Sequence, residues 1–304
     1  MMVEAGSKNL PYQAGLEGRR LAAILSKTQI DRLGDRLKKD PHTESDLRLL
    51  DDYRRSFGEA YEAVVRTLRE RLQNPTGRPA KSTVSIVEKL RRESIRLSQM
   101  QDIAGCRVVV TNVVEQERSI ALLSAAFPGA SVIDRRDNPS YGYRAIHIIA
   151  ELSGMPIEIQ VRSSLQHLWA ELSEKSSDVL DPTIKYGGGP DEWRSFLTKN
   201  SEIVASYEEW EKARSEAVAA SEVMMTAYEE FKKAGAELPE SDLHDHEVQE
   251  ALVMLADATR EMERAEQEDQ EDREEMGRVW SMLTDSLNTA ISWLDERRRK
   301  GQKQ

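Results

Sequence analysis

Apolar residues recur every three or four positions along most of this chain, which is typical of amphipathic helices. The longest early stripe comprises Leu47, Leu50, Phe57, Tyr61, Val64, Leu68 and Leu72. It predicts one helix that begins at a cap formed by Thr43 or Ser45. Shorter helices are expected over residues 26–37 and 85–97, whereas residues 1–16 show no clear period.

The period changes in the middle of the chain, where short β-branched runs replace the helical stripe. Strands are expected at residues 106–110, 131–133, 145–152 and 155–161, with a helix at 114–127. The last two strands alternate about Ser153-Gly154, which indicates a β-hairpin. Residues 78–180 are therefore predicted to form a small α+β domain with a mixed sheet.

Residues 191–233 and 247–298 are expected to form two long helices, because their apolar stripes continue over many turns. The break between them contains Gly235 and Pro239. A helical hairpin that regulates or pairs the protein and a coiled coil that binds a partner both remain open. Three regions are predicted: a lead-in with a short helix at 1–44, the α+β domain with its N-terminal helix at 45–190, and the hairpin at 191–304.

Charge is unevenly distributed along the chain. Of the 304 residues, 32% are charged and the net charge is −11, which argues against a broad basic surface for nucleic acid. Residues 239–276 hold 15 acidic residues and 3 arginines, and residues 78–96 hold six cations against two anions. The cations could hold a triphosphate or form a solvated helix face; the acidic segment could cover them, meet a basic partner or add solubility.

A single cysteine, Cys106, excludes an internal disulfide, and no apolar run is long enough to span a bilayer. A reducing cytoplasm with no membrane association is therefore expected.

Two carboxylates stand where strands are expected. Asp102 comes just before the strand at 106–110, and alternation puts Glu158, Gln160 and Arg162 on one face of the last strand. Such a polar row is costly to bury without a role. Carboxylates that face each other across strands could hold Mg²⁺, although an edge strand with a solvated face would show the same pattern.

Phosphate ligands are expected at the start of the helix after residue 82. Ser85 and Lys89 share a helix face, and Lys81 lies at its positive end. Arg78 can hold two phosphate oxygens at once. The pattern is common by chance, so it indicates a phosphate site only together with its neighbours.

A tyrosine–histidine segment is a candidate for binding a second substrate. Tyr143 follows Gly142 and can stack on a base, and Arg144 can reach its phosphates, with His147 nearby. A tyrosine that packs a turn and a satisfied core histidine is the alternative.

In order, these segments resemble the synthetase domain of the RelA/SpoT family, especially the single-domain small alarmone synthetases. The resemblance rests on Arg78, Lys81, Ser85-Ile86, Lys89; Asp102, Gly105, Arg107; Gly142-Tyr143-Arg144, His147; and Glu158, Gln160, Arg162. It covers about a third of the chain. It implies a nucleotidyltransferase-like α+β fold with a mixed sheet flanked by helices, here followed by the long helical hairpin.

The resemblance also implies an activity, a nucleotide 3′-pyrophosphokinase that moves pyrophosphate from ATP to the 3′-hydroxyl of GDP or GTP to make (p)ppGpp. ATP would be held by Arg78, Lys81, Ser85, Lys89 and Arg107. Asp102 and Glu158 would hold Mg²⁺ and carry the catalysis. The acceptor would be bound by Tyr143, Arg144, His147, Gln160 and Arg162.

The chain departs from the family pattern in the short segment expected to bind the acceptor. This segment has Arg135-Arg136-Asp137 followed by Tyr141-Gly142-Tyr143. Loops of this kind are similar to those of toxic small alarmone synthetases, so the 3′ end of tRNA or an adenine nucleotide is an alternative acceptor. A nucleotide-sensing module without turnover and a helical scaffold are further alternatives. The intact carboxylates argue against the first of these, and the polar row on the last strand argues against the second.

Overall fold

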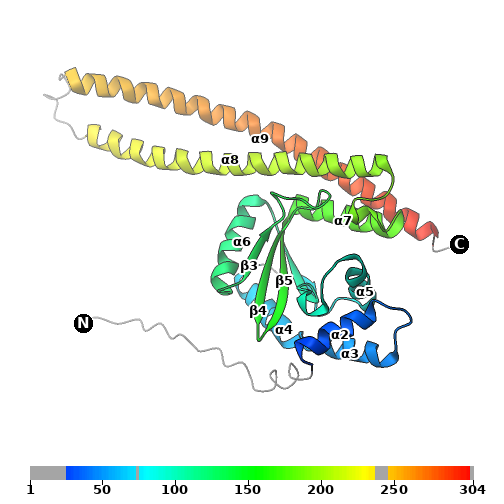
Figure 1. Cartoon of the computed structure of the whole chain (residues 1–304). Helices are drawn as coiled ribbons and strands as arrows, with labels where there is room; N and C mark the ends of the chain where they lie inside the picture. Colours follow the sequence, from blue (N-terminus) through cyan, green and yellow to red (C-terminus); the bar gives the residue numbers. More distant parts are fainter. Residues whose placement is uncertain (1–24, 73–74, 237–245, 302–304) are drawn as a thin grey trace, which may run out of the picture. The chain divides into compact units, whose positions relative to one another are not determined.

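The computed structural model describes residues 25–72, 75–236 and 246–301. They form two compact units, each assembled from separate segments of the chain (Figure 1). The first unit holds the residues before Val110 together with 117–134 and 145–162, and the second holds 110–116, 135–144 and the residues from Ser163 onward. The predicted boundaries at residues 44 and 190 stay predictions.

Five strands form one sheet in the order β1-β2-β5-β4-β3. They are β1 (Thr76–Arg78), β2 (Ala104–Val110), β3 (Ser131–Asp134), β4 (Ile146–Leu152) and β5 (Met155–Ser163). β1 pairs antiparallel with β2, and β4 pairs antiparallel with both β3 and β5. Ser153 and Gly154 join β4 to β5 with positive φ angles of 54° and 79°, as a two-residue hairpin turn requires. The predicted hairpin and α+β class with a mixed sheet are confirmed.

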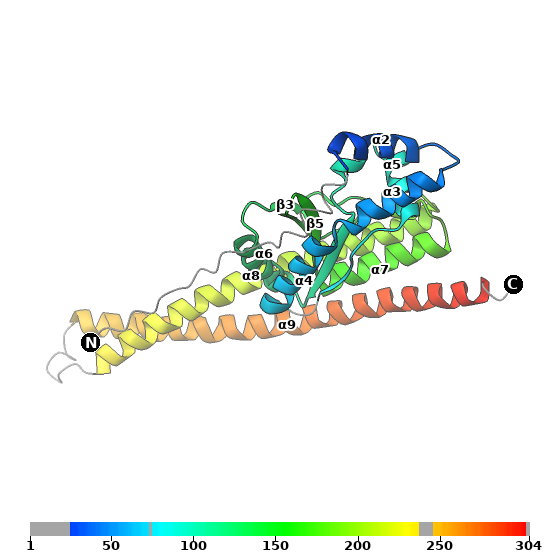
Figure 2. The same cartoon turned by 90° about the horizontal axis from the view of Figure 1, so that it is seen from below.

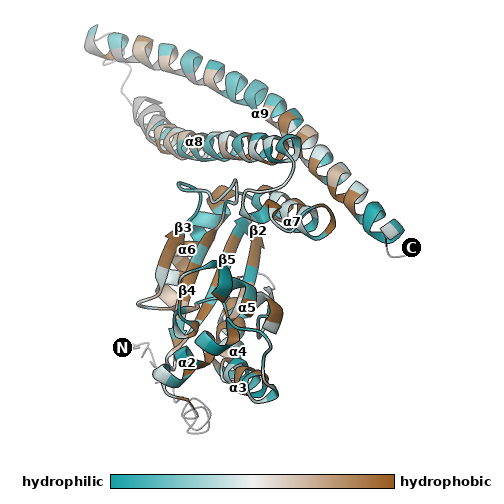
Figure 3. Ribbon diagram, turned by 45° about the vertical axis from the view of Figure 1, so that its right-hand side comes forward, coloured by the Kyte–Doolittle hydropathy of each residue, from teal (hydrophilic) through white to brown (hydrophobic). Residues whose placement is uncertain are grey.

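The helices of the first unit build a core beneath the sheet. They are α2 (Lys27–Leu37), α3 (Glu44–Arg55), α4 (Gly58–Arg71), α5 (Thr83–Arg92), and most of α6 (Val113–Ala126). α2 packs against α3 and α5, which Figure 2 shows as a group, and α4 packs against β4. The apolar strands, brown in Figure 3, contribute Ile148 and Ile159 to a core that also contains Leu33, Leu50, Phe57, Leu68 and Ile86.

Two local predictions for this unit were wrong, and one strand was not predicted at all. The helix expected from residue 43 to 72 is two helices, because α3 ends at Ser56, whose hydroxyl donates to the Tyr53 carbonyl. The helix expected over 85–97 ends at Arg92, since Glu93 is extended, and Leu97–Gln99 form a short 3₁₀ turn. Strand β1 was not expected, because its three residues are all exposed and carry no alternation.

Three helices form the second unit, and the two long ones confirm the helices expected near the C-terminus. They are α7 (Ser164–Val179), α8 (Asp191–Ala236) and α9 (His246–Gly301). α9 packs against both α7 and α8 (Figure 1). The predicted break with Gly235 and Pro239 falls largely outside the described residues. No helix within the described ranges is long and apolar enough to cross a membrane.

Buried residues from all three helices make one apolar cluster, which includes Leu165, Trp169, Leu172, Leu197, Val204, Tyr207, Leu283, Leu287 and Leu294. Ion pairs flank it. Lys175 contacts Asp295 at 2.7 Å, and Arg214 contacts Asp269 at 2.9 Å. The hairpin therefore packs with α7 where it carries these buried residues, between Leu197 and Tyr207 and between Leu283 and Leu294. Residues 216–227 and 264–275 of the hairpin are mostly exposed.

Candidate active site

Asp102 lies between two lysine side chains in the first unit. The Lys81 ammonium is 2.6 Å from Oδ2 and the Lys89 ammonium is 3.0 Å from Oδ1. All three side chains are largely buried. Burial alone would raise the pKa of Asp102, but the two lysine charges and their hydrogen bonds outweigh it and hold the pKa below its usual value. Asp102 is therefore an ionised carboxylate in a cationic setting.

The start of α5 brings these cations together. The backbone N–H of Lys81 donates to the Ile103 carbonyl at 2.6 Å, which ties the residue to the chain beside Asp102. Ser82 caps the helix by accepting from the Ser85 N–H at 3.2 Å, and its hydroxyl donates to Ser85 Oγ at 2.8 Å. Lys89 follows two turns into the helix. The prediction that Ser82 begins the helix is confirmed.

Arg78 and Arg107, two further predicted ATP residues, lie on the first two strands of the sheet. Arg78 is exposed at the end of β1, where it pairs with Gly105 of β2. Arg107 is half-buried on β2, opposite Thr76. All five predicted ATP residues therefore belong to the first unit, and two of them contact Asp102 directly.

Glu158 is held on the central strand β5 by two partners. His147 Nδ1 lies 3.0 Å from Oε1, and the Gln160 amide donates to Oε2 at 2.8 Å. The Glu158 side chain is 15% exposed. Burial raises its pKa, but the hydrogen bond and charge of His147, with the Gln160 amide, outweigh burial and hold the pKa below the usual value. Glu158 is thus ionised despite its burial.

The polar row predicted on the last strand forms a connected chain of hydrogen bonds. Arg162 donates to the Gln160 oxygen at 2.9 Å, while the amide of Gln160 donates to Glu158. Register pairs His147 directly with Gln160 across β4 and β5. Because β5 lies in the middle of the sheet and Arg162 is buried, the alternative of a solvated edge strand is excluded.

Gly105 explains why β2 can lie close to Glu158. A Cβ atom at this position would stand 2.8 Å from the Glu158 carbonyl oxygen. Only glycine allows this approach without a backbone shift. The glycine in the sequence motif that begins with Asp102 therefore has a structural role beside the second carboxylate.

The two carboxylates fit a divalent cation. The charge of Asp102 raises the pKa of Glu158, so the two groups interact. The Oδ1 atom of Asp102 is buried, and the Lys89 ammonium lies 3.0 Å from it. Oxygen ligands of this kind suit Mg²⁺, which keeps several waters and needs few protein ligands. Within the described residues there is no group of three or more acidic, histidine or cysteine side chains that could form a denser metal site.

Tyr143 and Arg144 belong to the second unit, in the segment 135–144, which we call the acceptor loop. The Tyr143 ring is half-buried and packs against the apolar cluster of that unit. The neighbouring Tyr141 is 64% exposed and has a positive φ of 55°. The base-stacking role of Tyr143 stays a prediction.

Arg144 has partners that the sequence did not reveal. Its Nε and Nη2 lie 3.1 and 2.9 Å from Glu208 Oε2, and its Nη1 donates to the Arg136 carbonyl at 2.7 Å. The side chain is only 13% exposed. A direct contact between Arg144 and an acceptor phosphate would therefore have to compete with a bidentate ion pair.

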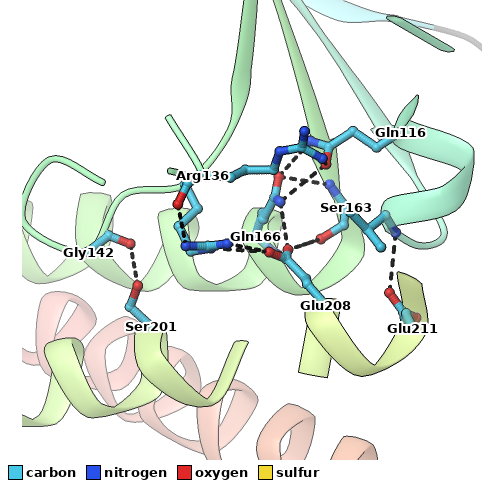
Figure 4. A network of polar contacts seen from close by, with 10 residues as sticks. Gln116, Arg136, Gly142, Ser163, Gln166, Ser201, Glu208 and Glu211 are labelled. Carbon is cyan, nitrogen blue, oxygen red and sulfur yellow. Dashed lines mark hydrogen bonds and ion pairs between the residues drawn. The ribbon is translucent and has the colours of Figure 1, made fainter. Parts of the chain in front are cut away.

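Glu208 is part of a larger polar network that sequence reasoning missed (Figure 4). Its Oε1 accepts from Gln166 at 2.6 Å and from the Ser163 hydroxyl at 3.2 Å. Gln116 and Gln166 exchange hydrogen bonds at 2.8 and 3.3 Å. The spacing of Ser163 and Gln166 is a capping-box signal, but one glutamate on a highly charged helix gives no signal.

Comparisons with known proteins identify the region that holds the carboxylates. Residues 77–177 match the family model described as a region found in RelA / SpoT proteins. The chain is 36% identical over 117 residues to the uncharacterized protein Rv1366 of Mycobacterium tuberculosis, covering 37% of this chain and 43% of that protein. It is 28% identical over 96 residues to the probable GTP diphosphokinase RSH2 of Arabidopsis thaliana, covering 30% and 13%.

The chain spans less than half the length of the curated proteins it matches. Among solved structures, the small alarmone synthetase 1 of Bacillus subtilis is 27% identical. That match covers 59% of this chain and 100% of the other, with a TM-score of 0.44.

Proposed function

We propose that this chain, whose residues 77–177 belong to the RelA/SpoT family, is a nucleotide 3′-pyrophosphokinase. It would transfer the β,γ-pyrophosphate of ATP to the ribose 3′-hydroxyl of GDP or GTP and release AMP. The observation that carries the proposal is the pair of largely buried, ionised carboxylates, Asp102 and Glu158, which interact with each other and stand beside two lysines.

The donor site would be built from the cations of the first unit. Lys81 and Lys89 now neutralise Asp102, and a triphosphate would give the same ammonium groups additional oxygen partners. The helix N-terminus at Ser85 supports phosphate binding further. Arg78 and Arg107, on β1 and β2, would contact the outer phosphates.

Glu158 would receive the proton of the acceptor hydroxyl. As the O–H bond breaks, the 3′-oxygen bonds to the β-phosphorus of ATP, the bond from that phosphorus to the α–β bridging oxygen breaks, and AMP departs. Because the Glu158 pKa is low for a buried carboxyl, the group is ionised and able to accept a hydrogen bond from the hydroxyl. His147 and Gln160 would keep the carboxylate oriented.

Mg²⁺ would be held by Asp102 and Glu158, where it would neutralise charge on the transferred phosphates. The remaining catalysis would come from positioning and charge neutralisation by the lysines and arginines. A cytoplasmic location fits the single buried cysteine, Cys106.

The acceptor assignment rests on the relative named as a probable GTP diphosphokinase. Tyr143 would stack on the acceptor base, and His147, Gln160 and Arg162 are the further acceptor residues that the family resemblance implies. The acceptor test below includes tRNA and an adenine nucleotide as alternatives to GDP and GTP. The long helices could also bind a second copy of the chain or another protein.

The test is incubation with γ-labelled ATP and Mg²⁺ in separate reactions with GDP, GTP, ATP and tRNA, followed by chromatography. Label on GDP or GTP is the expected result. Label on tRNA or on the adenine nucleotide would keep the reaction and change the acceptor. Saturable ATP binding without any labelled product would favour the nucleotide-sensing module and contradict the proposal. Omission of Mg²⁺ should abolish transfer.

A further inference from the structure

We propose that Glu208 of α8 is a positioning residue for the proposed reaction, because it latches the acceptor loop to the C-terminal helices. The inference rests on the proposed function, since the loop matters only if Tyr143 binds an acceptor. It would give the long helices a part in binding the acceptor. We call the Glu208–Arg144 ion pair and its hydrogen bonds the loop latch.

The first part of the argument is the geometry of Arg144. Two of its nitrogens hold one oxygen of Glu208, and a third nitrogen donates to the Arg136 carbonyl within the same loop. The guanidinium therefore closes the loop on itself and fastens it to α8. Arg144 directly follows Tyr143 in the chain, so a change in the latch must move the residue predicted to stack on the acceptor.

The second part is the use of both carboxylate oxygens of Glu208. While Oε2 binds the loop, Oε1 accepts from Gln166 and Ser163 at the start of α7. The Glu208 side chain is 4% exposed, and an ion pair this buried is costly to break on one side only. Glu208 therefore fixes the loop relative to α7 and α8 together, all within the second unit.

A second contact from α8 holds the other side of the tyrosine. The Ser201 hydroxyl donates to the Gly142 carbonyl at 2.7 Å (Figure 4). A Cβ atom on Gly142, whose φ is 88°, would stand 2.7 Å from the Trp169 ring. Tyr143 is thus flanked by Gly142 and Arg144, and both neighbours are bound to α8, two turns apart on that helix.

The test compares Glu208→Gln with wild type in the full-length protein. Hydrogen exchange of residues 135–144 should become faster, because the neutral amide leaves the charge of Arg144 without its buried counter-charge and only a weaker hydrogen bond can remain. The KM for the acceptor should rise about tenfold or more, while the Kd for ATP changes less than about twofold. Unchanged exchange in the loop together with an unchanged acceptor KM would overturn the proposal.

Two further variants separate positioning from other roles. Asp269→Asn removes an ion pair between α8 and α9 that does not contact the loop, and it should leave the acceptor KM unchanged. An equal rise in this variant would mean a general loosening of the helices and would overturn the latch. If Glu208→Gln does not fold, Ser201→Ala tests the second contact instead. Hydrogen exchange of residues 135–144 should also become faster in this variant. Unchanged exchange would count against the proposal.

Arg144→Gln and the Arg144→Gln/Glu208→Gln double variant complete the design. If Arg144 acts through the latch, adding Glu208→Gln to Arg144→Gln should cost little more. Fully additive losses would show that the two residues act separately and would reject the latch. If the wild-type protein transfers no pyrophosphate, the proposed function is rejected but the latch is not, because hydrogen exchange tests the latch without turnover.

Discussion

The carboxylate site and the loop latch are both buried arrangements of charged side chains, yet they are built in opposite ways. The carboxylate site, formed by Lys81, Lys89, Asp102, His147 and Glu158, is assembled by the register of the sheet and one helix start. The loop latch joins residues 64 positions apart through one glutamate on a long helix. The alternation of side chains along a strand can be seen in the sequence. A contact between the loop and a distant glutamate on a charged helix leaves no such pattern.

The comparison also separates two kinds of function. In the carboxylate site, Asp102 and Glu158 are both ionised and act on each other's charge, although their oxygens already lie beside lysine, histidine and amide groups. In the latch, both oxygens of Glu208 and the guanidinium of Arg144 are taken up by protein partners. The first arrangement suits chemistry, and the second suits positioning.

The most severe test of the carboxylate site is the removal of either charge at nearly constant volume. Glu158→Gln and Asp102→Asn should each lower turnover by on the order of a hundredfold or more, because each removes a carboxylate that would hold Mg²⁺, and Mg²⁺ would neutralise phosphate charge. Labelled-ATP transfer measures the effect. Melting temperatures within about 3 °C of wild type would confirm that the fold is intact. Near-wild-type turnover in normally folded variants would reject the assignment.

A smaller effect is expected from the lysines. Lys81→Ala and Lys89→Ala should each weaken ATP binding by about 1.5–3 kcal/mol, because each removes a charge-assisted hydrogen bond to phosphate. Direct titration with an ATP analogue measures this, and Arg48→Ala on exposed α3 is the matched surface control. Equal affinity in all three variants would show that the two lysines serve only to pair with Asp102 and do not bind ATP.

The close approach of β2 to β5 predicts a stability effect at Gly105. Gly105→Ala should lower the free energy of unfolding by about 1–3 kcal/mol, because the new Cβ meets the Glu158 carbonyl and the strands must shift. Urea unfolding measures the change. Gly58→Ala, where no atom lies within 4 Å of the added Cβ, is the control and should not destabilise. The same small loss in both variants would contradict the steric account.

A titratable residue on α8, Glu211, predicts that the stability of the protein depends on pH. Burial and the Glu208 charge raise the pKa of Glu211 to about 7, against a lowering hydrogen bond from the Val113 N–H. Between pH 4.5 and 7 the folded state keeps a proton that the unfolded state has released. The stability contributed by protonated Glu211 is therefore lost as the pH rises through this window.

Glu211→Gln should remove this dependence. Its Tm relative to wild type should be higher at pH 8 than at pH 5, which thermal unfolding at the two pH values measures. Glu209→Gln, an exposed neighbour on α8, should show the same difference from wild type at both. If the Tm difference between Glu211→Gln and wild type is the same at both pH values, the pKa of Glu211 is not raised in the folded protein.

Much of the carboxylate site and its sheet could be predicted from the sequence. Alternation placed Glu158, Gln160 and Arg162 on one face, and the helix expected after residue 82 begins there. These features are local, so neighbouring residues record them. The break at Ser56 was missed because the apolar stripe continues across it.

The loop latch could not be predicted, because nothing near Glu208 distinguishes it from the other glutamates of α8. Its partners Arg144, Ser163 and Gln166 lie 42 to 64 residues away in the chain, so the contact is a tertiary property. The role expected for Arg144 was inferred from its neighbours Tyr143 and His147, and the partner that occupies its guanidinium lies 64 residues away.

The central claim is that the carboxylate site catalyses pyrophosphate transfer rather than transfer of a single phosphate. The most direct measurement is the ratio of AMP to modified acceptor in a reaction with ATP and the best acceptor, with Glu158→Gln in parallel. The account predicts one AMP for each acceptor that gains two phosphates, and neither product from the variant. Formation of ADP, or of AMP without a modified acceptor, would contradict it.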